Sequence, residues 1–141
     1  MAYRFPSEEY VQAVMDVLNQ DEQYAQIARN WEGDILFVIE PDKGIESVDL
    51  PMTFYFDLWH GKCREARVID LEEEEVPDAA YTLTAPQANC LRILRGELDP
   101  MQAMITRRLK VEGSMAYMLR NVPTVLDFVR CCSSVEIEIE E

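Results

Sequence analysis

Histidine and cysteine are the first candidates for chemistry in this chain, because imidazoles and thiolates bind metals and act as bases or nucleophiles. The chain has one histidine and four cysteines: His60, Cys63, Cys90, Cys131 and Cys132. His60 and Cys63 have a metal-like His-x-x-Cys spacing, but zinc needs two more ligands, and the adjacent Cys131 and Cys132 are too close to form a typical pair. His60 also falls in a predicted hairpin turn, where a lone histidine usually faces solvent. We therefore predict no metal site and no catalytic histidine.

The acidic run Glu72–Glu75 is the next candidate, because paired carboxylates can act as a general acid and base. Four adjacent like charges repel one another, and such a run is most often a solvated loop. The sequence contains no nucleophile elbow, phosphate-binding loop or dinucleotide fingerprint. We therefore predict a protein that is not an enzyme and has no cofactor.

Methionine and aromatic residues are better candidates, for binding rather than catalysis. The chain has seven methionines, and four of them lie between Met101 and Met118. Methionine is flexible and polarizable, so it suits surfaces that accept varied apolar shapes. Phe54, Phe56 and Tyr81 lie on predicted strands that would face these methionines. Helical spacing alone favours ordinary core packing, and a pocket for an apolar molecule is the alternative.

The charge is unevenly distributed along the chain. A formal net charge of −14 argues against nucleic-acid binding, which needs a basic face. Residues 85–130, however, carry seven basic and four acidic side chains. The simpler interpretation is that these basic residues form surface salt bridges with the acidic half of the chain. The alternative is a patch that meets lipid head groups or the anionic end of a ligand. Arg92, Arg95 or Arg120 would then bind a carboxylate or phosphate through a bidentate pair.

The sequence also bears on location. The N-terminus lacks the apolar run of a signal peptide, and no stretch approaches the length of a membrane span. The four scattered cysteines suit reduced thiols better than a disulfide framework. We expect a cytoplasmic protein that does not insert stably into membranes.

The first half of the chain predicts two helices and three strands. Ser7 can cap the first helix, and Asp21 can cap a second helix that extends through Trp31. The expected strands are 35–39, 52–59 and 62–69, the last two joined by a hairpin turn at positions 60–61. Strand 35–39 is apolar on both faces, so it should be central or covered on both sides.

The second half predicts a strand at 79–83, a helix after it, a second helix, a strand at 108–112 and C-terminal helices. Thr84 should cap the first of these helices, and Gly96 should end it. Asp99 and Pro100 should start the next. Ser114 should start another, which Pro123 breaks or re-aims. The alternating residues at the C-terminus could form a short edge strand.

Several segments carry a resemblance to a known family. They are Gly96–Pro100 (GELDP) with Ala103, Leu109–Gly113 (LKVEG) and Asp78–Thr84 (DAAYTLT), with weaker similarity around 31–33 and 58–62. Taken in order, they resemble the sterol carrier protein 2 (SCP-2) sterol-binding domain. The chain departs from that family at Arg107-Arg108, where the family usually carries Gly-Lys.

The element order predicts an α+β domain, and the resemblance implies its details. We expect a five-stranded, mainly antiparallel sheet with helices on one face enclosing an apolar cavity, formed by one domain over residues 1–134 and followed by an acidic C-terminal tail over 135–141. The expected ligand-binding residues are Phe54, Phe56, Tyr81, Leu91, Met101, Met104, Leu109, Val111, Met115, Met118, Leu119, Leu126, Val129 and Arg120.

The function that the resemblance implies is non-enzymatic lipid binding or transfer, with a fatty acid, fatty acyl thioester or sterol-like ligand in an apolar tunnel. The last helix, 123–132, would be its gate. The alternative is a homodimeric interaction or accessory module whose pocket is filled by side chains and holds no ligand. The expected partner is therefore a lipid or other apolar small molecule, or a second copy of the chain.

Overall fold

A five-stranded mixed sheet forms the base of the molecule. The computed structural model describes residues 2–41 and 51–138. The strands are β2 (Ile35–Glu40), β3 (Met52–Trp59), β4 (Lys62–Ile69), β5 (Tyr81–Pro86) and β6 (Lys110–Glu112). Their order is β4-β3-β2-β5-β6, and β2 and β5 are the parallel pair in an otherwise antiparallel sheet. The predicted α+β fold with a mainly antiparallel sheet is confirmed, and β2 is central as its apolar faces indicated.

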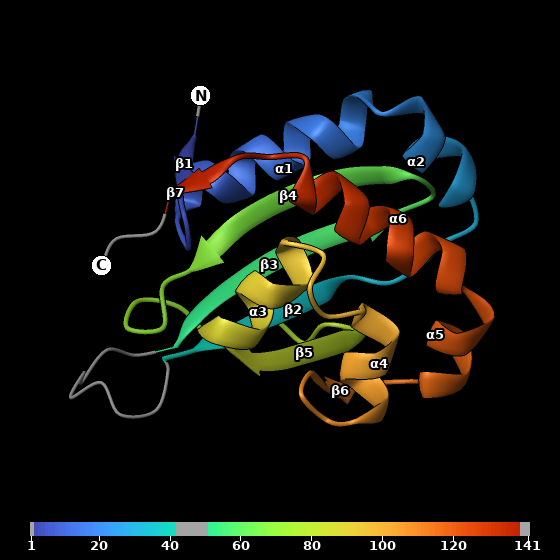
Figure 1. Ribbon diagram of the computed structural model, residues 1–141. Helices are drawn as coiled ribbons and strands as arrows, with labels where there is room; N and C mark the ends of the chain where they lie inside the picture. Colours follow the sequence, from blue (N-terminus) through green and yellow to red (C-terminus); the bar gives the residue numbers. More distant parts are fainter. Residues whose placement is uncertain (1, 42–50, 139–141) are drawn as a thin grey trace.

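The helices cover one face of this sheet (Figure 1). They are α1 (Glu8–Gln20), α2 (Glu22–Ile27), α3 (Gln87–Leu94), α4 (Pro100–Ile105), α5 (Met115–Arg120) and α6 (Val122–Ser133). Four predicted caps form: the side chains of Ser7, Asp21, Asp99 and Ser114 accept from the first-turn backbone N–H groups of α1, α2, α4 and α5. These local signals therefore fix where most helices begin.

Helix α2 is shorter than predicted, because it ends at Ile27 rather than at Trp31. The Trp31 ring packs against Tyr81 and Tyr117, with ring centroids 5.7 and 5.1 Å away, and its indole N–H donates to the Gly33 carbonyl at 2.9 Å. These contacts turn the chain toward the sheet before another helical turn can form.

The predicted cap at Thr84 is wrong. Thr84 lies within β5, paired with Val38 on one side and Lys110 on the other. Helix α3 begins only after Pro86 and has no side-chain cap. Pairing on both sides of β5 outweighs the capping tendency of a single threonine. The helix is interrupted next to Pro123, as expected: α5 ends at Arg120 and α6 begins at Val122. Pro123 lies in the first turn of α6, where a missing N–H costs nothing.

The two ends of the chain meet in a small second sheet. Strand β1 (Tyr3–Arg4) pairs in parallel with β7 (Ile137–Glu138). The predicted edge strand therefore forms in the described part of the C-terminus, whereas 139–141 lie outside the described residues. The domain boundary after residue 134 remains an expectation.

Both faces of the sheet are covered, although unequally. The inner face packs against the helices and contributes most of the core. The outer face carries a smaller cluster of Leu36, Tyr55 and Ile69, against which Leu71 and Ala79 pack. The segment between β4 and β5 thus supplies part of the cover that the outer face needs.

Candidate functional site

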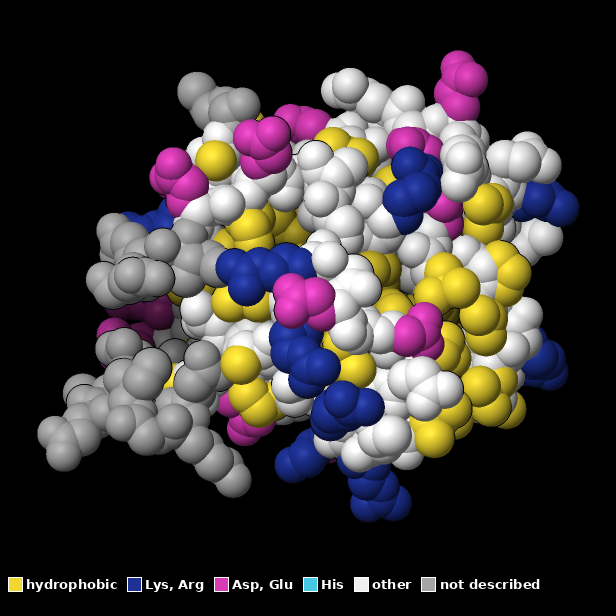
Figure 2. Space-filling view, in the orientation of Figure 1, with side chains coloured by type: hydrophobic (Ala, Val, Ile, Leu, Met, Phe, Trp, Pro, Cys, Tyr) yellow, Lys and Arg dark blue, Asp and Glu magenta, His cyan; other side chains and the backbone are white. Residues whose placement is uncertain are grey.

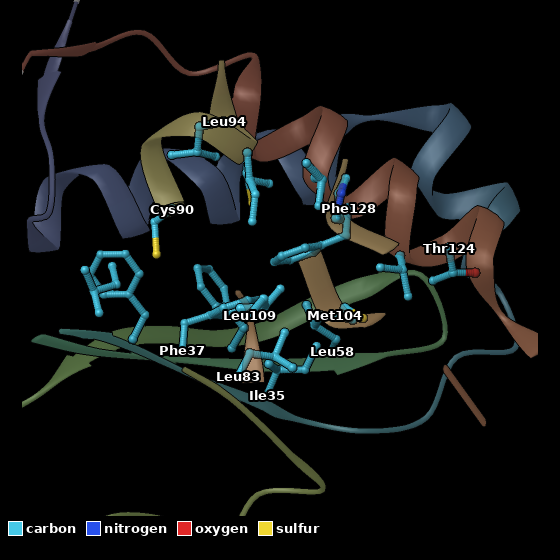
Figure 3. Close-up of a pocket in the computed structure, with 18 of the residues that line it drawn as sticks. Ile35, Phe37, Leu58, Leu83, Cys90, Leu94, Met104, Leu109, Thr124 and Phe128 are labelled. Carbon is cyan, nitrogen blue, oxygen red and sulfur yellow. The ribbon is translucent and has the colours of Figure 1, made fainter. Parts of the chain in front are cut away.

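An apolar cavity lies between the inner face of the sheet and helices α3 to α6. Its volume is about 110 Å³. Figure 3 shows the strand residues Ile35, Phe37 and Leu83 on one side and the helix residues Cys90, Leu94 and Phe128 on the other.

Three phenylalanines shape the centre of the cavity. The rings of Phe37 on β2 and Phe128 on α6 stack with centroids 5.7 Å apart and an interplanar angle of 2°. Phe56 on β3 meets Phe128 edge-on, with centroids 5.6 Å apart. The sheet and α6 therefore contact each other through aromatic rings, with the unfilled space beside them.

The polar atoms of three lining residues hydrogen-bond to backbone carbonyls. The Tyr10 hydroxyl donates to the Cys132 carbonyl at 2.9 Å, and the Thr124 hydroxyl donates to the Ile27 carbonyl at 3.2 Å. The indole N–H of Trp31, also in the lining, donates to Gly33. Burial raises the pKa values of Tyr10 and Cys132, so both side chains are uncharged near neutral pH. The cavity therefore presents almost entirely carbon to a ligand.

The structure brings six of the fourteen predicted ligand-binding residues together in the lining. They are Phe54, Phe56, Met104, Leu109, Met118 and Val129. Phe54 and Phe56 on β3 thus line the cavity together with inward side chains of α4, α5 and α6.

The other eight residues lie outside this lining. Tyr81 packs against Trp31 and Tyr117, whereas Leu91 is buried near the cavity without lining it. Partly buried positions are occupied by Met101, Val111 and Met115; exposed positions are occupied by Leu119, Arg120 and Leu126. Helices α4 and α5 have only six residues each. Helix α4 buries Pro100, Ala103 and Met104 and α5 buries only Met118, so their other apolar residues are partly buried or exposed.

Sequence reasoning missed several lining residues on the strands and on α3. These are Ile35, Phe37, Ile39, Leu58, Leu83, Cys90, Ile93 and Leu94, together with Phe5, Tyr10, Tyr24 and Trp31 from the N-terminal segment. The alternation that selected Phe54 and Phe56 could have found Leu58, which lies two residues further along the same strand face. The N-terminal residues had no such signal, because only the fold brings α1 and α2 to this side.

The two residues with metal-like spacing, His60 and Cys63, have different surroundings. The His60 ring forms an exposed pair with Glu32, with Nε2 and Oε2 2.6 Å apart. Cys63 is buried, its thiol contacts the Glu65 carbonyl, and burial raises its pKa to about 12.

Another group in the described ranges, Asp21, Asp127 and Cys131, has ligand atoms close enough for a metal ion. Arg130 bonds to both of its carboxylates, and Gln23 also donates to Asp127 at 2.7 Å. The arrangement is therefore an ion-pair network that ties α6 to the start of α2.

A protein-family comparison shows which family the chain is part of. The model of the SCP-2 sterol transfer family matches residues 14–125, which include the sheet and most of the residues that line the cavity. The chain belongs to the SCP-2 sterol transfer family. No curated protein sequence matches it significantly.

Solved structures of SCP-2 proteins have a similar fold. A crystal structure of sterol carrier protein 2 is 27% identical, with a TM-score of 0.80 over 92% of this chain and 97% of that one. A conserved hypothetical protein from Thermus thermophilus, described as possibly a sterol carrier protein, is 26% identical, with a TM-score of 0.80 over 94% of this chain and 90% of that one.

The SCP-2 fold also occurs inside a larger enzyme. An inverting sec-alkylsulfatase from Pseudomonas sp. is 15% identical, with a TM-score of 0.55 over 94% of this chain but only 16% of that one. At this identity the likeness concerns the fold alone.

Proposed function

We propose that this SCP-2 family member is a non-enzymatic lipid carrier, which captures a fatty acid, a fatty acyl thioester or a sterol-like molecule in the cavity between its sheet and its helices. The apolar lining, whose polar groups at Tyr10, Trp31 and Thr124 bond to backbone carbonyls, carries this proposal. Such a surface binds by area burial, at about 25 cal/mol per Å² of apolar surface removed from water, or roughly 0.8 kcal/mol per methylene.

The size of the cavity adds a condition. An engineered cavity of about 150 Å³ holds a molecule as small as benzene, so about 110 Å³ is too small for a long acyl chain or a sterol. The helical layer must therefore move when such a ligand enters. Helix α6 is the proposed gate, because it supplies Thr124, Val125, Phe128, Val129 and Cys132 to the lining.

The first test is native mass spectrometry of the freshly purified protein, repeated after delipidation and after addition of a series of fatty acids. We expect an extra mass of one lipid that disappears on delipidation and returns with added fatty acid. Affinity should rise with chain length until the cavity is full. A clean apo mass with no uptake would overturn the carrier proposal.

A cavity-filling variant makes the test specific to the site. Leu83→Phe adds volume on the floor of the cavity, and we expect it to weaken fatty-acid binding at least about tenfold by overpacking. Leu126→Phe makes the same substitution on an exposed position of α6 and should leave binding unchanged. Equal binding by both variants would locate the lipid outside this cavity.

The second candidate is an accessory or homodimeric module that holds no ligand. Occurrence of the same fold within the sulfatase favours it. The cover that Leu71 and Ala79 give the outer face of the sheet weighs against pairing through that face. A lipid-free dimer in the same mass spectra would favour this candidate.

A further inference from the structure

Three helices that enclose the cavity carry apolar side chains on their outer surface. Ile105 on α4 is 67% exposed, Leu119 on α5 is 55% exposed and Leu126 on α6 is 40% exposed. Among the described residues only Trp59 and Val76 are comparable large exposed hydrophobic residues. Helices α4 and α5 both pack on α6, and Figure 2 shows hydrophobic side chains gathered over this region. We call Ile105, Leu119 and Leu126 the apolar face.

A basic band lies beside the apolar face. Its members, all exposed, are Arg92, Arg95, Arg107, Arg108 and Arg120. Figure 2 shows dark-blue side chains in a band along one side of the hydrophobic area, with few acidic ones between them. Only Glu97, Asp99 and Glu112 oppose them in the same segment, so it is positive within a chain of net charge −14.

The basic band is not neutralised by ion pairs. Among the described residues, none of its five members forms an ion pair with a carboxylate, whereas Arg64, Arg67 and Arg130 elsewhere each do. The simpler interpretation was that the seven basic residues in 85–130 form salt bridges with the acidic half of the chain. Within the described part of the chain, only Arg130 does so. Guanidinium groups without a carboxylate partner are available to phosphates, which they bind in a bidentate manner.

The combination points to one kind of partner. Exposed aliphatic side chains flanked by arginine match an anionic bilayer, whose interface accepts apolar groups and whose phosphates attract cations. Helix α1 on another part of the surface does not, because it carries Glu8, Glu9 and Asp16 and no basic residue. In residues 2–41 and 51–138, no helix is both long and apolar enough to cross a membrane, so contact here would be at the surface.

We infer that the apolar face and the basic band together form a docking surface for anionic lipid bilayers. The same helices present Met104, Met118 and Val125 to the cavity on their inner side, so docking would place the cavity wall against the membrane. This last consequence rests on the proposed carrier function, but the docking itself does not.

The test is flotation of the delipidated protein, residues 1–141, with two kinds of vesicle. One contains equal parts of phosphatidylcholine and phosphatidylglycerol, and the other contains phosphatidylcholine alone. We expect binding to the anionic vesicles only, at least about tenfold above the neutral ones, and weakening as salt shortens the Debye length below about 8 Å. Equal binding to both vesicles, or to neither, would overturn the inference.

Variants locate the surface. Arg107→Gln with Arg108→Gln, and separately Ile105→Asp with Leu119→Asp, should each reduce anionic-vesicle binding about tenfold or more. Lys62→Gln on β4 and Val76→Asp, 52% exposed between β4 and β5, are the matched controls and should bind like the parent protein. Controls that weaken binding as much as the test variants would contradict the assignment to this face.

Two further outcomes distinguish membrane docking from dimer formation and from lipid uptake. If the protein forms a dimer that Ile105→Asp with Leu119→Asp converts to a monomer, and vesicles do not bind, the face joins two copies and the inference is wrong. If vesicles bind but the protein takes up no fatty acid, docking stands while the carrier proposal fails. If the protein takes up fatty acid but does not bind vesicles, the carrier proposal stands and the docking inference fails.

Discussion

At the scale of single residues, Phe128 connects the helical layer to the sheet beside the cavity. It contacts Phe37 face to face and Phe56 edge-on, and so joins α6 to two strands of the sheet. It is buried, with 6% of its surface exposed, whereas Leu126 two positions earlier on α6 is 40% exposed. Neighbouring apolar residues of one helix thus have different roles, which their types alone do not reveal.

We expect Phe128→Ala to lower the free energy of unfolding by about 3–5 kcal/mol, because it removes buried surface and enlarges a cavity that already exists. Leu126→Ala should cost less than about 1 kcal/mol, because its side chain is partly solvated in the folded state. Urea denaturation followed by circular dichroism measures both. Similar losses for the two variants would contradict the burial of Phe128 against the sheet.

The cysteines give a second prediction at this scale. Burial raises the pKa of Cys131 to about 11 and that of Cys63 to about 12, and it raises that of Cys132 as well. Because the thiolate is the reactive form, these three should alkylate slowly in the native protein. Cys90, partly buried in the cavity lining, should be labelled first, and bound fatty acid should slow it.

Peptide mass spectrometry after timed treatment with iodoacetamide checks this order. Labelling of Cys132 as fast as that of Cys90 would show that α6 does not shield its inner side. No protection of Cys90 by added fatty acid would argue against a ligand beside it.

At the scale of elements, turns and their close contacts hold the helices in place. Gly61 in the β3–β4 hairpin and Gly96 after α3 both have positive φ angles, of 81° and 75°. Their surroundings differ: a Cβ atom on Gly61 would lie 2.6 Å from the carbonyl oxygen of Ala25, whereas nothing lies within 4 Å of one on Gly96. The hairpin therefore packs directly against the backbone of α2.

This difference predicts two unequal costs for the same substitution. Gly96→Ala should cost about 1–2 kcal/mol, from backbone strain alone. Gly61→Ala should cost at least about 1 kcal/mol more, because the hairpin and α2 must also move apart. Thermal and urea unfolding of both variants measure the difference. Equal costs would mean that the hairpin does not contact α2 in solution.

At the scale of the whole molecule, two arginines join elements through acidic partners: Arg130 ties α6 to the start of α2, and Arg67 ties β4 to the acidic run that follows it. Arg130 on α6 joins Asp21 and Asp127, and Arg67 on β4 joins Glu65 and Glu74. The hydrogen bond from Arg130 lowers the pKa of Asp21, and the one from Arg67 lowers the pKa of Glu74. Both carboxyls therefore bind protons less readily in the folded chain than in the unfolded one.

The stability that these two groups contribute should consequently be complete above the ordinary pKa range of carboxyls and be lost as the pH falls through their lowered folded-state values. Urea denaturation between neutral pH and pH about 3 should show this loss. Asp21→Asn with Glu74→Gln should flatten the dependence. Asp16→Asn with Glu72→Gln changes the net charge equally at exposed positions and should not. A slope unchanged in the first double variant would contradict the role of these pairs.

The fold was predictable from the sequence because its signals are local. Alternation set the bounds of β3 and β4, and the caps at Ser7, Asp21, Asp99 and Ser114 set where four helices begin. Thr84 was misassigned because its strand is held by pairing to β2 and β6, which lie far away in the chain.

The candidate site was predictable only in part, for the same reason. Met104 and Met118 belong to the cavity and Leu119 and Leu126 do not, yet all four have the apolar character expected of a lining residue. Phe5 and Tyr10 reach the lining from the N-terminal segment. Local sequence patterns predict the order of the elements and provide enough apolar residues to line a cavity. Tertiary packing selects the side chains that enclose it, because the inward face of a six-residue helix depends on the elements packed around it.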